Sequence, residues 1–260
     1  MQTLDENILS RLQQSAPENC TILPGSTPVI AFGWFRTAEI ATISLNPSYK
    51  EFDLVKGKNR FHTLDSLGLH SYADIKAEHG EQIIDYCERY FERDVVYKDW
   101  FNRMTTFIKN STGYDYYEGT ACHLDLSQWA TNDIWGKLSH VQQKDLVSTG
   151  DIELLGEIIK HGKFHTLFLN GKKISMEIFH FFGVQPKKVL LRQTTKIDGK
   201  IKNKVEGFIS TTSSIAGVEI GREITLIGWN TYVKYAGADV LNLISKWIKE
   251  ELGKANVAQL

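Results

Sequence analysis

Short apolar runs alternate with amphipathic segments along most of the chain, and this alternation predicts the elements of the fold. Apolar runs bounded by turn residues are typical of buried strands, whereas apolar residues at helical spacing indicate helices. We predict strands at residues 28–35, 38–46, 119–126, 165–171, 189–195, 205–211 and 223–230. Helices are expected within 81–110 and at 138–147, 151–162, 172–183 and 240–252. The alternation favours an α/β/α sandwich with a mostly parallel central sheet that helices cover on both faces.

The N-terminal segment begins with a helix signal. Thr3 can cap a helix with Glu6 three residues later, and apolar residues follow at helical spacing. We expect a short amphipathic helix here, within a helical extension over residues 1–28 that packs on the rest of the protein. No repeat, low-complexity tract or Pro/Gly/Ser-rich linker interrupts the chain, so residues 1–260 are expected to form a single domain.

Composition and charge narrow the class of protein. The 260 residues are 42% hydrophobic and 23% charged, with 30 Lys and Arg against 31 Asp and Glu and a net charge of -1. These values describe a soluble globular protein, and they argue against intrinsic disorder and against a histone-like electrostatic binder. The longest apolar stretch, Val29 to Phe35, is far short of the roughly 20 residues that span a bilayer, so no membrane association is expected. Asp5 and Glu6 stand where a secretion signal would have its apolar core, which favours a cytoplasmic protein.

The sequence gives no sign of a metal or cofactor site. Cys20, Cys87 and Cys122 lie far apart, which argues against a zinc knuckle and a four-thiolate iron–sulfur site. The chain also lacks a nucleophile elbow, a Walker loop, a dinucleotide-binding glycine pattern and an HExxH helix. We therefore expect no metal and no cofactor, and neither phosphoryl transfer nor hydride transfer.

Polar side chains follow four of the predicted strands at their carboxyl ends. They are Asn46, Asp125, Asn170 and Asn230. Because ligands bind beyond the carboxyl ends of the strands in open α/β sheets, these side chains are expected to meet at one site. Each has an alternative explanation by itself, since Asn-Pro and Asn-Gly start turns and a strand-end Asp often caps the next helix. Their coincidence favours a polar site.

The segment around Asn46 resembles a known motif. The sequence ATISLNPSYKEF followed by KGKNRFHTL is similar to the first motif of the uracil-DNA glycosylase superfamily, most of all its mismatch-specific and single-strand-selective branches. EITLIGWNTYVKYA matches the second motif of the superfamily in placement, and HTLFLNGKKI resembles its middle strand. The resemblance spans Val29 to Ala236 and implies a uracil-DNA glycosylase-like fold. Ser44 and Ser48 stand where glycine is usual, and the Pro-Ser of the second motif is missing, departures that concern the substrate more than the fold.

The resemblance implies roles for individual residues. Asn46 corresponds to the position that orients a water molecule for hydrolysis of the N-glycosidic bond, a reaction that needs no covalent nucleophile. Asn230 and Tyr232 open the loop in which the superfamily places its leaving-group contact and its wedge. Together with Asp125, Asn46 and Asn230 are the expected catalytic residues. No lysine is singled out for lyase chemistry, so a monofunctional enzyme that leaves an abasic site is expected.

A DNA substrate requires further contacts. A base in a duplex must be flipped out to reach such a site and held there by stacking, for which Tyr49, Phe52 and Phe61 are candidates, with ordinary core or loop aromatics as the alternative. Candidates for contacts to the DNA backbone are Ser48, Lys50, Lys58 and Arg60 near the Asn46 turn, and Lys172 and Lys173 at a helix start. A helix N-terminus also attracts phosphate. The basic turn at residues 196–204 is more simply interpreted as a charged surface exposed to solvent.

Asp125 bears on the identity of the base. The two-residue strand period places His123 and Asp125 on one side of their strand, and both, with Asn170, are expected to contact the substrate. A buried carboxylate needs a partner, so the alternatives are a helix cap or a pair with His123. The superfamily commonly presents an Asn here that reads uracil. A carboxylate can instead accept from the N4 amino group of cytosine, or, if protonated, donate to N3, so a cytosine-derived base is expected.

Three functions are compatible with these features. The leading hypothesis is a monomeric DNA glycosylase that removes a modified or damaged base, in DNA repair or in defence against phage with modified DNA. The first alternative is a binder of damaged or modified nucleotides that uses the same pocket without catalysis. The second is a small-molecule module with a flavodoxin-like sheet, which would bind a cofactor tightly and ignore DNA.

Overall fold

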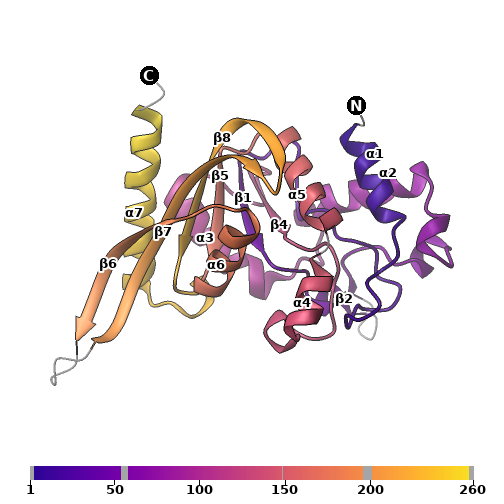
Figure 1. Ribbon diagram of the computed structural model, residues 1–260, viewed down its shortest axis with the longest axis horizontal. Coiled ribbons are helices and arrows are strands. Elements are labelled where there is room, and N and C mark those ends of the chain that lie inside the picture. Colours follow the sequence, from indigo (N-terminus) through magenta and orange to yellow (C-terminus); the bar gives the residue numbers. More distant parts are fainter. Residues whose placement is uncertain (1–2, 54–57, 148, 196–200, 258–260) are drawn as a thin grey trace.

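The computed structural model describes residues 3–53, 58–147, 149–195 and 201–257 and has one six-stranded sheet at its centre (Figure 1). The strands are β1 (Ile40–Ser44), β4 (Ala121–Asp125), β5 (Thr166–Asn170), β6 (Lys187–Thr195), β7 (Ile201–Ile215) and β8 (Val218–Trp229), in the order β4-β1-β5-β8-β7-β6. Strands β4, β1, β5 and β8 run parallel, and β7 and β6 continue the sheet antiparallel. The single-domain α/β class predicted from the sequence is confirmed, with a mixed sheet.

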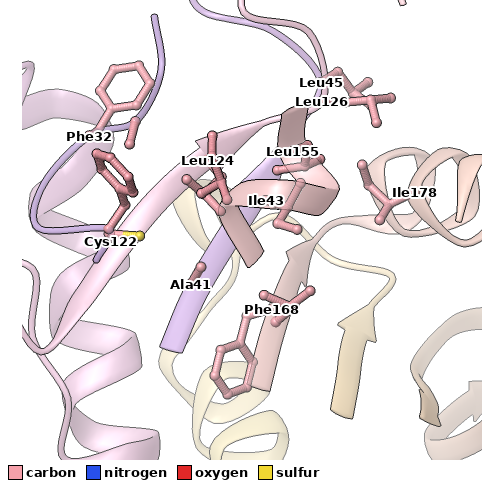
Figure 2. Packing of buried hydrophobic residues seen from close by; sticks show 14 of the residues in the cluster. Phe32, Ala41, Ile43, Leu45, Cys122, Leu124, Leu126, Leu155, Phe168 and Ile178 are labelled. Atoms are coloured by element: carbon pink, nitrogen blue, oxygen red, sulfur yellow. The ribbon is translucent and has the colours of Figure 1, made fainter. Parts of the chain in front are cut away.

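The parallel strands are short and fully covered. Every residue of β1, β4 and β5 is buried, as expected for strands that carry helices on both faces. Their register aligns Ser44 with Asp125 across β1 and β4. Figure 2 shows side chains from these strands in the hydrophobic core together with Leu155 and Ile178 from two helices. The carboxyl ends of β1 and β4 therefore stop level with each other.

Helices cover the two faces of the sheet. The α-helices of the described residues are α1 (Leu4–Leu12), α2 (Ala77–Glu88), α3 (Lys98–Thr112), α4 (His140–Leu146), α5 (Thr149–His161), α6 (Lys172–Phe181) and α7 (Ala238–Val257). On β8, a Cβ atom at Gly228 would lie 2.5 Å from Ser175 Oγ of α6, whereas the next residue, Trp229, packs against Phe107 of α3 at a ring distance of 5.1 Å. Because successive strand residues point to opposite faces, α6 and α3 lie on opposite sides of the sheet.

The N-terminal helix forms as predicted. Thr3 and Glu6 make a reciprocal capping box at the start of α1, and Ile8 and Leu12 are fully buried. Beyond Leu12 the segment up to residue 28 contains no further helix; it runs along the loop after β4, where Leu23 N donates to Ala130 O at 3.0 Å. Pairing with that loop holds the segment extended.

The apolar run at residues 28–35 is not a strand of the sheet, contrary to the prediction. It makes one antiparallel bridge, in which Phe32 N donates to His123 O and His123 N donates to Phe32 O, both at 2.9 Å. Gly33 follows with a φ of 97°, a conformation that favours glycine and ends the pairing. The run is apolar because it covers the edge of β4, where Phe32 packs against His123.

A small hairpin and two helices separated by a 3-10 turn complete the fold around the six-stranded sheet. A two-stranded hairpin of β2 (Phe52–Asp53) and β3 (Lys58–Asn59) follows the β1 turn. The predicted helical region at 81–110 is divided between α2 and α3, with a 3-10 turn at Tyr90–Glu92 between them. In the ranges that the structure describes, no helix combines the length and apolar character needed to cross a membrane.

Candidate functional site

A cavity of about 390 Å³ opens at the carboxyl edge of the parallel strands. Its wall comes from six places in the chain: Phe32 before β1, the end of β1 with its turn, the start of α3, the end of β4 with the loop that follows, the first turn of α6, and the loop after β8. The chain leaves β1 toward β4 and leaves β5 toward β8, so the connections diverge between β1 and β5, the position where open α/β sheets bind ligands. The prediction that strand ends meet at one edge is confirmed, although only Asn46 and Asp125 of the four predicted residues line the cavity.

Asn46 holds its side chain amide in a fixed orientation. Its Nδ2 donates to Thr131 Oγ1 at 2.8 Å and to Pro47 O at 3.1 Å. The Thr131 hydroxyl donates its own proton to Asp133 O at 2.7 Å, so it must accept from Asn46, and this fixes which end of the amide is nitrogen. No hydrogen bond from a described residue reaches Asn46 Oδ1. This oxygen is left as an oriented acceptor at the cavity wall.

Asp125 is buried without a hydrogen-bond partner. Its side chain is 1% exposed, and neither carboxylate oxygen has a hydrogen bond within the described part of the chain. His123 Nε2 lies 3.6 Å from Oδ1, too far for a hydrogen bond. The helix-cap alternative therefore does not apply, and the pair with His123 is at most electrostatic. Buried carboxylates are rarely left unsatisfied, so Asp125 on the wall of the cavity is a strong candidate for a ligand contact.

His123 is positioned from behind by two hydroxyl groups. Its Nδ1 lies 2.7 Å from Thr42 Oγ1, which lies 2.6 Å from the hydroxyl of the buried Tyr116. When Tyr116 donates to Thr42 and Thr42 donates to Nδ1, the imidazole is neutral and carries its proton on Nε2, the nitrogen that faces Asp125. The chain thus orients the ring at the cavity wall.

Glu51 is a second buried carboxyl group in the cavity, and the sequence analysis missed it. The residue is 2% exposed, and the Tyr90 hydroxyl donates to its Oε2 at 2.8 Å. Burial raises the pKa of Glu51 to about 7, the hydrogen bond from Tyr90 opposes the shift, and the nearby charge of Asp125 adds to it. Its faint signal in the amino-acid sequence is an acidic residue directly before the apolar Phe52, just after the Asn46 turn.

The aromatic residues fall into two groups. Tyr49, which is 41% exposed, and the half-buried Tyr232 both line the cavity. Phe52 and Phe61 do not, and they are 1% and 3% exposed. Phe61 stacks on Tyr90 at a ring distance of 5.2 Å, inside the core. The prediction that Phe52 and Phe61 stack on a base is wrong for this structure, because the hairpin after β1 folds them inward. Tyr97, Trp100 and Trp135 line the cavity instead.

The side chains of Asn170 and Asn230 form hydrogen bonds within the protein and do not line the cavity. Asn170 Oδ1 accepts from Trp229 Nε1 at 3.2 Å and from Val233 N at 3.0 Å, which ties the end of β5 to the loop after β8. Asn230 accepts from Glu206 N at 3.0 Å and donates to a carbonyl of β7 at 2.9 Å. Chain segments that the strand pairing brings close therefore engage the amide oxygen of Asn170 and both ends of the Asn230 amide. The expected substrate contact of Asn170 and catalytic contact of Asn230 are therefore corrected, and Asn170 acts by holding the loop that carries Tyr232.

The residues predicted to contact the DNA backbone also fall into two groups. Lys172 and Lys173 are exposed at the start of α6, next to Ile174 of the cavity wall. Lys50 is exposed and donates to Tyr97 Oη at 3.1 Å. The side chain of Arg60 is engaged within the protein, since its guanidinium donates to the carbonyls of Val95 and Lys50.

The remaining basic and polar candidates lie around the same turn. Ser48 lines the cavity and caps the 3-10 helix Tyr49–Glu51 (η1), accepting from Lys50 N at 3.3 Å. The backbone of Lys58 pairs in β3, whereas its side chain lies outside the described part, as does the tip of the basic turn at 196–200. Lys234, exposed on the cavity wall after β8, was not predicted.

The side chains of the cavity wall are suited to a polar organic ligand. In the ranges that the structure describes, no group of three or more His, Cys, Asp and Glu side chains could hold a metal ion. What the cavity presents is an oriented amide oxygen, two buried carboxyl groups and aromatic walls, a set suited to a planar ring with polar edges. Comparison with protein-family models and with curated proteins finds no match for this chain.

Proposed function

We propose that this protein is a monofunctional DNA glycosylase of uracil-DNA glycosylase-like fold that flips out a modified or damaged, cytosine-derived base and hydrolyses its N-glycosidic bond. The observation that carries the proposal is that one cavity holds both the oriented Asn46 oxygen and the Asp125 carboxylate, which has no hydrogen bond within the described residues. The Asn46 oxygen can accept a hydrogen bond from a water molecule, and the Asp125 carboxylate can accept one from the edge of a base.

The cavity has the size and walls for a nucleoside. Its volume of about 390 Å³ lies in the range of small-molecule sites, roughly 300 to 1,000 Å³. Tyr49, Tyr97, Trp100 and Tyr232 supply aromatic surface, and bases stack on such side chains for about 1–3 kcal/mol each. A base that leaves the duplex loses its stacking there, so these walls offset part of the cost of flipping.

Asn46 supports hydrolysis through its position. With Nδ2 engaged by Thr131 and Pro47, Oδ1 can accept a hydrogen bond from water and aim the oxygen of that water at the sugar. Orientation of this kind lowers the barrier because the reactants no longer lose their freedom at the transition state.

Asp125 supports the choice of a cytosine-derived base. Its two oxygens can only accept hydrogen bonds when ionised, so they match the N4 amino group and repel the O4 of uracil. Substituents at C5 point away from that edge, which leaves the exposed Tyr49 side of the cavity to accommodate them.

Exposed cations near the cavity suit the phosphates of DNA. Lys50 follows the Asn46 turn, Lys172 and Lys173 begin α6, and Lys234 lies on the loop after β8. Each carries its ammonium on an exposed side chain. A strand of DNA that delivers a base to the cavity would meet these groups, and each phosphate contact would release condensed counterions.

The test is a screen for base release. Purified protein is incubated with DNA that contains uracil, mismatched, alkylated or glucosylated hydroxymethylated bases, and alkali then reveals abasic sites as strand breaks. Release from a cytosine-derived substrate supports the proposal. Asn46→Ala should abolish release with DNA affinity retained, whereas Asn132→Ala, a substitution of an exposed asparagine, should change neither. Full activity of Asn46→Ala would remove Asn46 from the mechanism.

A non-catalytic binder of modified nucleotides is the second candidate. The observation in its favour is that Asn230, the expected leaving-group contact, does not line the cavity. The same screen separates the two, since a binder would retain modified DNA without producing abasic sites. Substrate preference also bears on the biological role: release of plain uracil alone would favour repair, and release of phage-type modified bases would favour defence.

A further inference from the structure

We propose that Glu51 is a catalytic acid, whose carboxyl proton passes to the base as it leaves. The proposal rests on the proposed glycosylase function and deepens it, because it supplies the leaving-group contact that Asn230 does not provide. Glu51 and Asp125 reach the cavity from different elements, η1 and the end of β4, so both carboxyl groups can meet one bound ring.

The surroundings of Glu51 leave one of its oxygens for a ligand. Oε2 accepts from the Tyr90 hydroxyl at 2.8 Å, and Tyr90 Oη in turn accepts from Tyr97 N at 3.0 Å. Within the described ranges, no hydrogen bond reaches Oε1. The residue is 2% exposed and lines the cavity, so an occupant of the cavity is the partner that Oε1 can have.

No cation forms an ion pair with Glu51 within the described residues. The charges of Arg60 and Arg93 oppose the rise in its pKa, but the guanidinium of Arg60 donates to the carbonyls of Val95 and Lys50, and that of Arg93 to carbonyls of Arg60 and Tyr86. The other facing groups are Asp125, whose charge opposes ionisation, and Tyr90. With burial as the largest cause, the pKa of Glu51 rises to about 7. The carboxyl group is therefore protonated in a large share of molecules at neutral pH.

The proton and electron balance of the step is simple. The bond between C1′ and the base nitrogen breaks, and its electron pair leaves with the base. The proton of Glu51 passes to an acceptor atom on the ring, so the base departs neutral. The water that Asn46 orients bonds to C1′ through its oxygen, and the proton that this water loses returns to Glu51 through solvent. Proton donation by a positioned acid contributes about 10²- to 10⁴-fold to rate.

The two carboxyl groups together define a class of base. Glu51 in its acid form donates to a ring nitrogen or carbonyl oxygen, while ionised Asp125 accepts from an amino group. A ring with an acceptor beside an exocyclic amine satisfies both groups. Protonation matters most for bases that leave poorly as anions, and amino-substituted pyrimidines belong to this class.

The experiment measures single-turnover base release against pH for wild type, Glu51→Gln, Tyr90→Phe and Glu219→Gln, the last a substitution of an exposed glutamate. Wild-type release should fall as pH rises through about 7, because the acid form of Glu51 is lost. Glu51→Gln should reduce the rate about 10²- to 10⁴-fold with DNA affinity retained and should abolish this pH dependence. Tyr90→Phe removes a hydrogen bond that lowers the pKa, so its decline should move to higher pH. Glu219→Gln should match wild type.

A measurement without substrate supports the kinetic one. Infrared difference spectroscopy of the free protein should show a protonated carboxyl band that titrates near neutral pH in wild type and is absent in Glu51→Gln. Circular dichroism establishes that each variant is folded before comparison.

The outcomes separate the two proposals. If wild type releases base while Glu51→Gln keeps both its rate and its pH dependence, the role of Glu51 is refuted and the glycosylase function stands. An unmoved decline in Tyr90→Phe, or no neutral-pH carboxyl band, also argues against Glu51. If wild type releases no base from any substrate of the screen, the glycosylase function is refuted and this inference with it.

Discussion

Replacing Asp125 with asparagine should stabilise the free protein and impair its function. Both oxygens of Asp125 are buried without a hydrogen bond in the described structure, so the folded state holds a charged group that water would solvate better. Asparagine has nearly the same shape and carries no charge. The substitution should therefore leave the packing around β4 unchanged while reducing the cost of burial.

The size of the effect follows from the missing hydrogen bonds. An unsatisfied buried polar group costs about 1–3 kcal/mol and a charged group costs more, while the neutral amide of asparagine keeps part of that cost. The net gain in the free energy of unfolding should be about 1–3 kcal/mol. For a chain of this size, each kcal/mol corresponds to about 2–4 °C in Tm. We expect Asp125→Asn to raise Tm by about 2–12 °C, measured by calorimetry, with the gain in free energy checked by urea unfolding.

The sign of the change tests the reasoning. Asp133→Asn, on the same cavity wall but half-exposed, is the matched control and should leave Tm nearly unchanged. A lower Tm for Asp125→Asn would mean that the carboxylate has a stabilising partner, namely a protonated His123 across the 3.6 Å gap. In base-release assays the variant should shift preference from cytosine-derived toward uracil-like substrates, and an unchanged preference would remove Asp125 from base reading.

Three further predictions concern charge elsewhere in the protein. Arg11→Ala should lower the free energy of unfolding by about 3–5 kcal/mol in urea titrations, because Arg11 forms a buried ion pair of 2.6 Å with Asp151; a loss under 1 kcal/mol would contradict this. The raised pKa of Glu51, about 7 against an ordinary 4.5, means that the folded state binds a proton more tightly than the unfolded state. The protonated carboxyl group therefore contributes about 3 kcal/mol to stability below about pH 4.5, and this contribution is lost as pH rises through about 7. Plots of unfolding free energy against pH for wild type and Glu51→Gln should differ in slope between these two pH values and have the same slope outside them. Replacing Lys172 and Lys173 should each reduce the log-log salt slope of DNA binding by about one unit, and an unchanged slope would locate the DNA elsewhere.

Local sequence determined most of the elements. The capping box of Thr3 and Glu6 fixes the start of α1, because both hydrogen bonds lie within four residues of chain. The apolar runs that became β1, β4 and β5 were readable for a similar reason, since strands buried on both faces need nearly every residue apolar. The meeting of Asn46 and Asp125 at one edge also followed from sequence, because parallel strands end together.

Tertiary structure decided which side chains face the cavity. Phe52 and Phe61 have the composition of stacking residues, but the hairpin after β1 turns them into the core, where Phe61 meets Tyr90. The amides of Asn170 and Asn230 could have reached a ligand, yet backbone groups distant in sequence bind the oxygens of both. Hydrogen bonding of this kind depends on which segments the sheet brings together, and no local pattern records it.

The burial of Glu51 is the clearest case of a property that sequence alone did not determine. A glutamate in a turn is expected at the surface, where its carboxyl group is ionised. Here the hydroxyl of Tyr90, contributed by the turn after α2, donates to it, and the charge of Asp125, contributed by β4, adds to the rise in its pKa. The acidity of a side chain depends on the solvent it loses and the charges it gains on folding, and both come from segments far away along the chain.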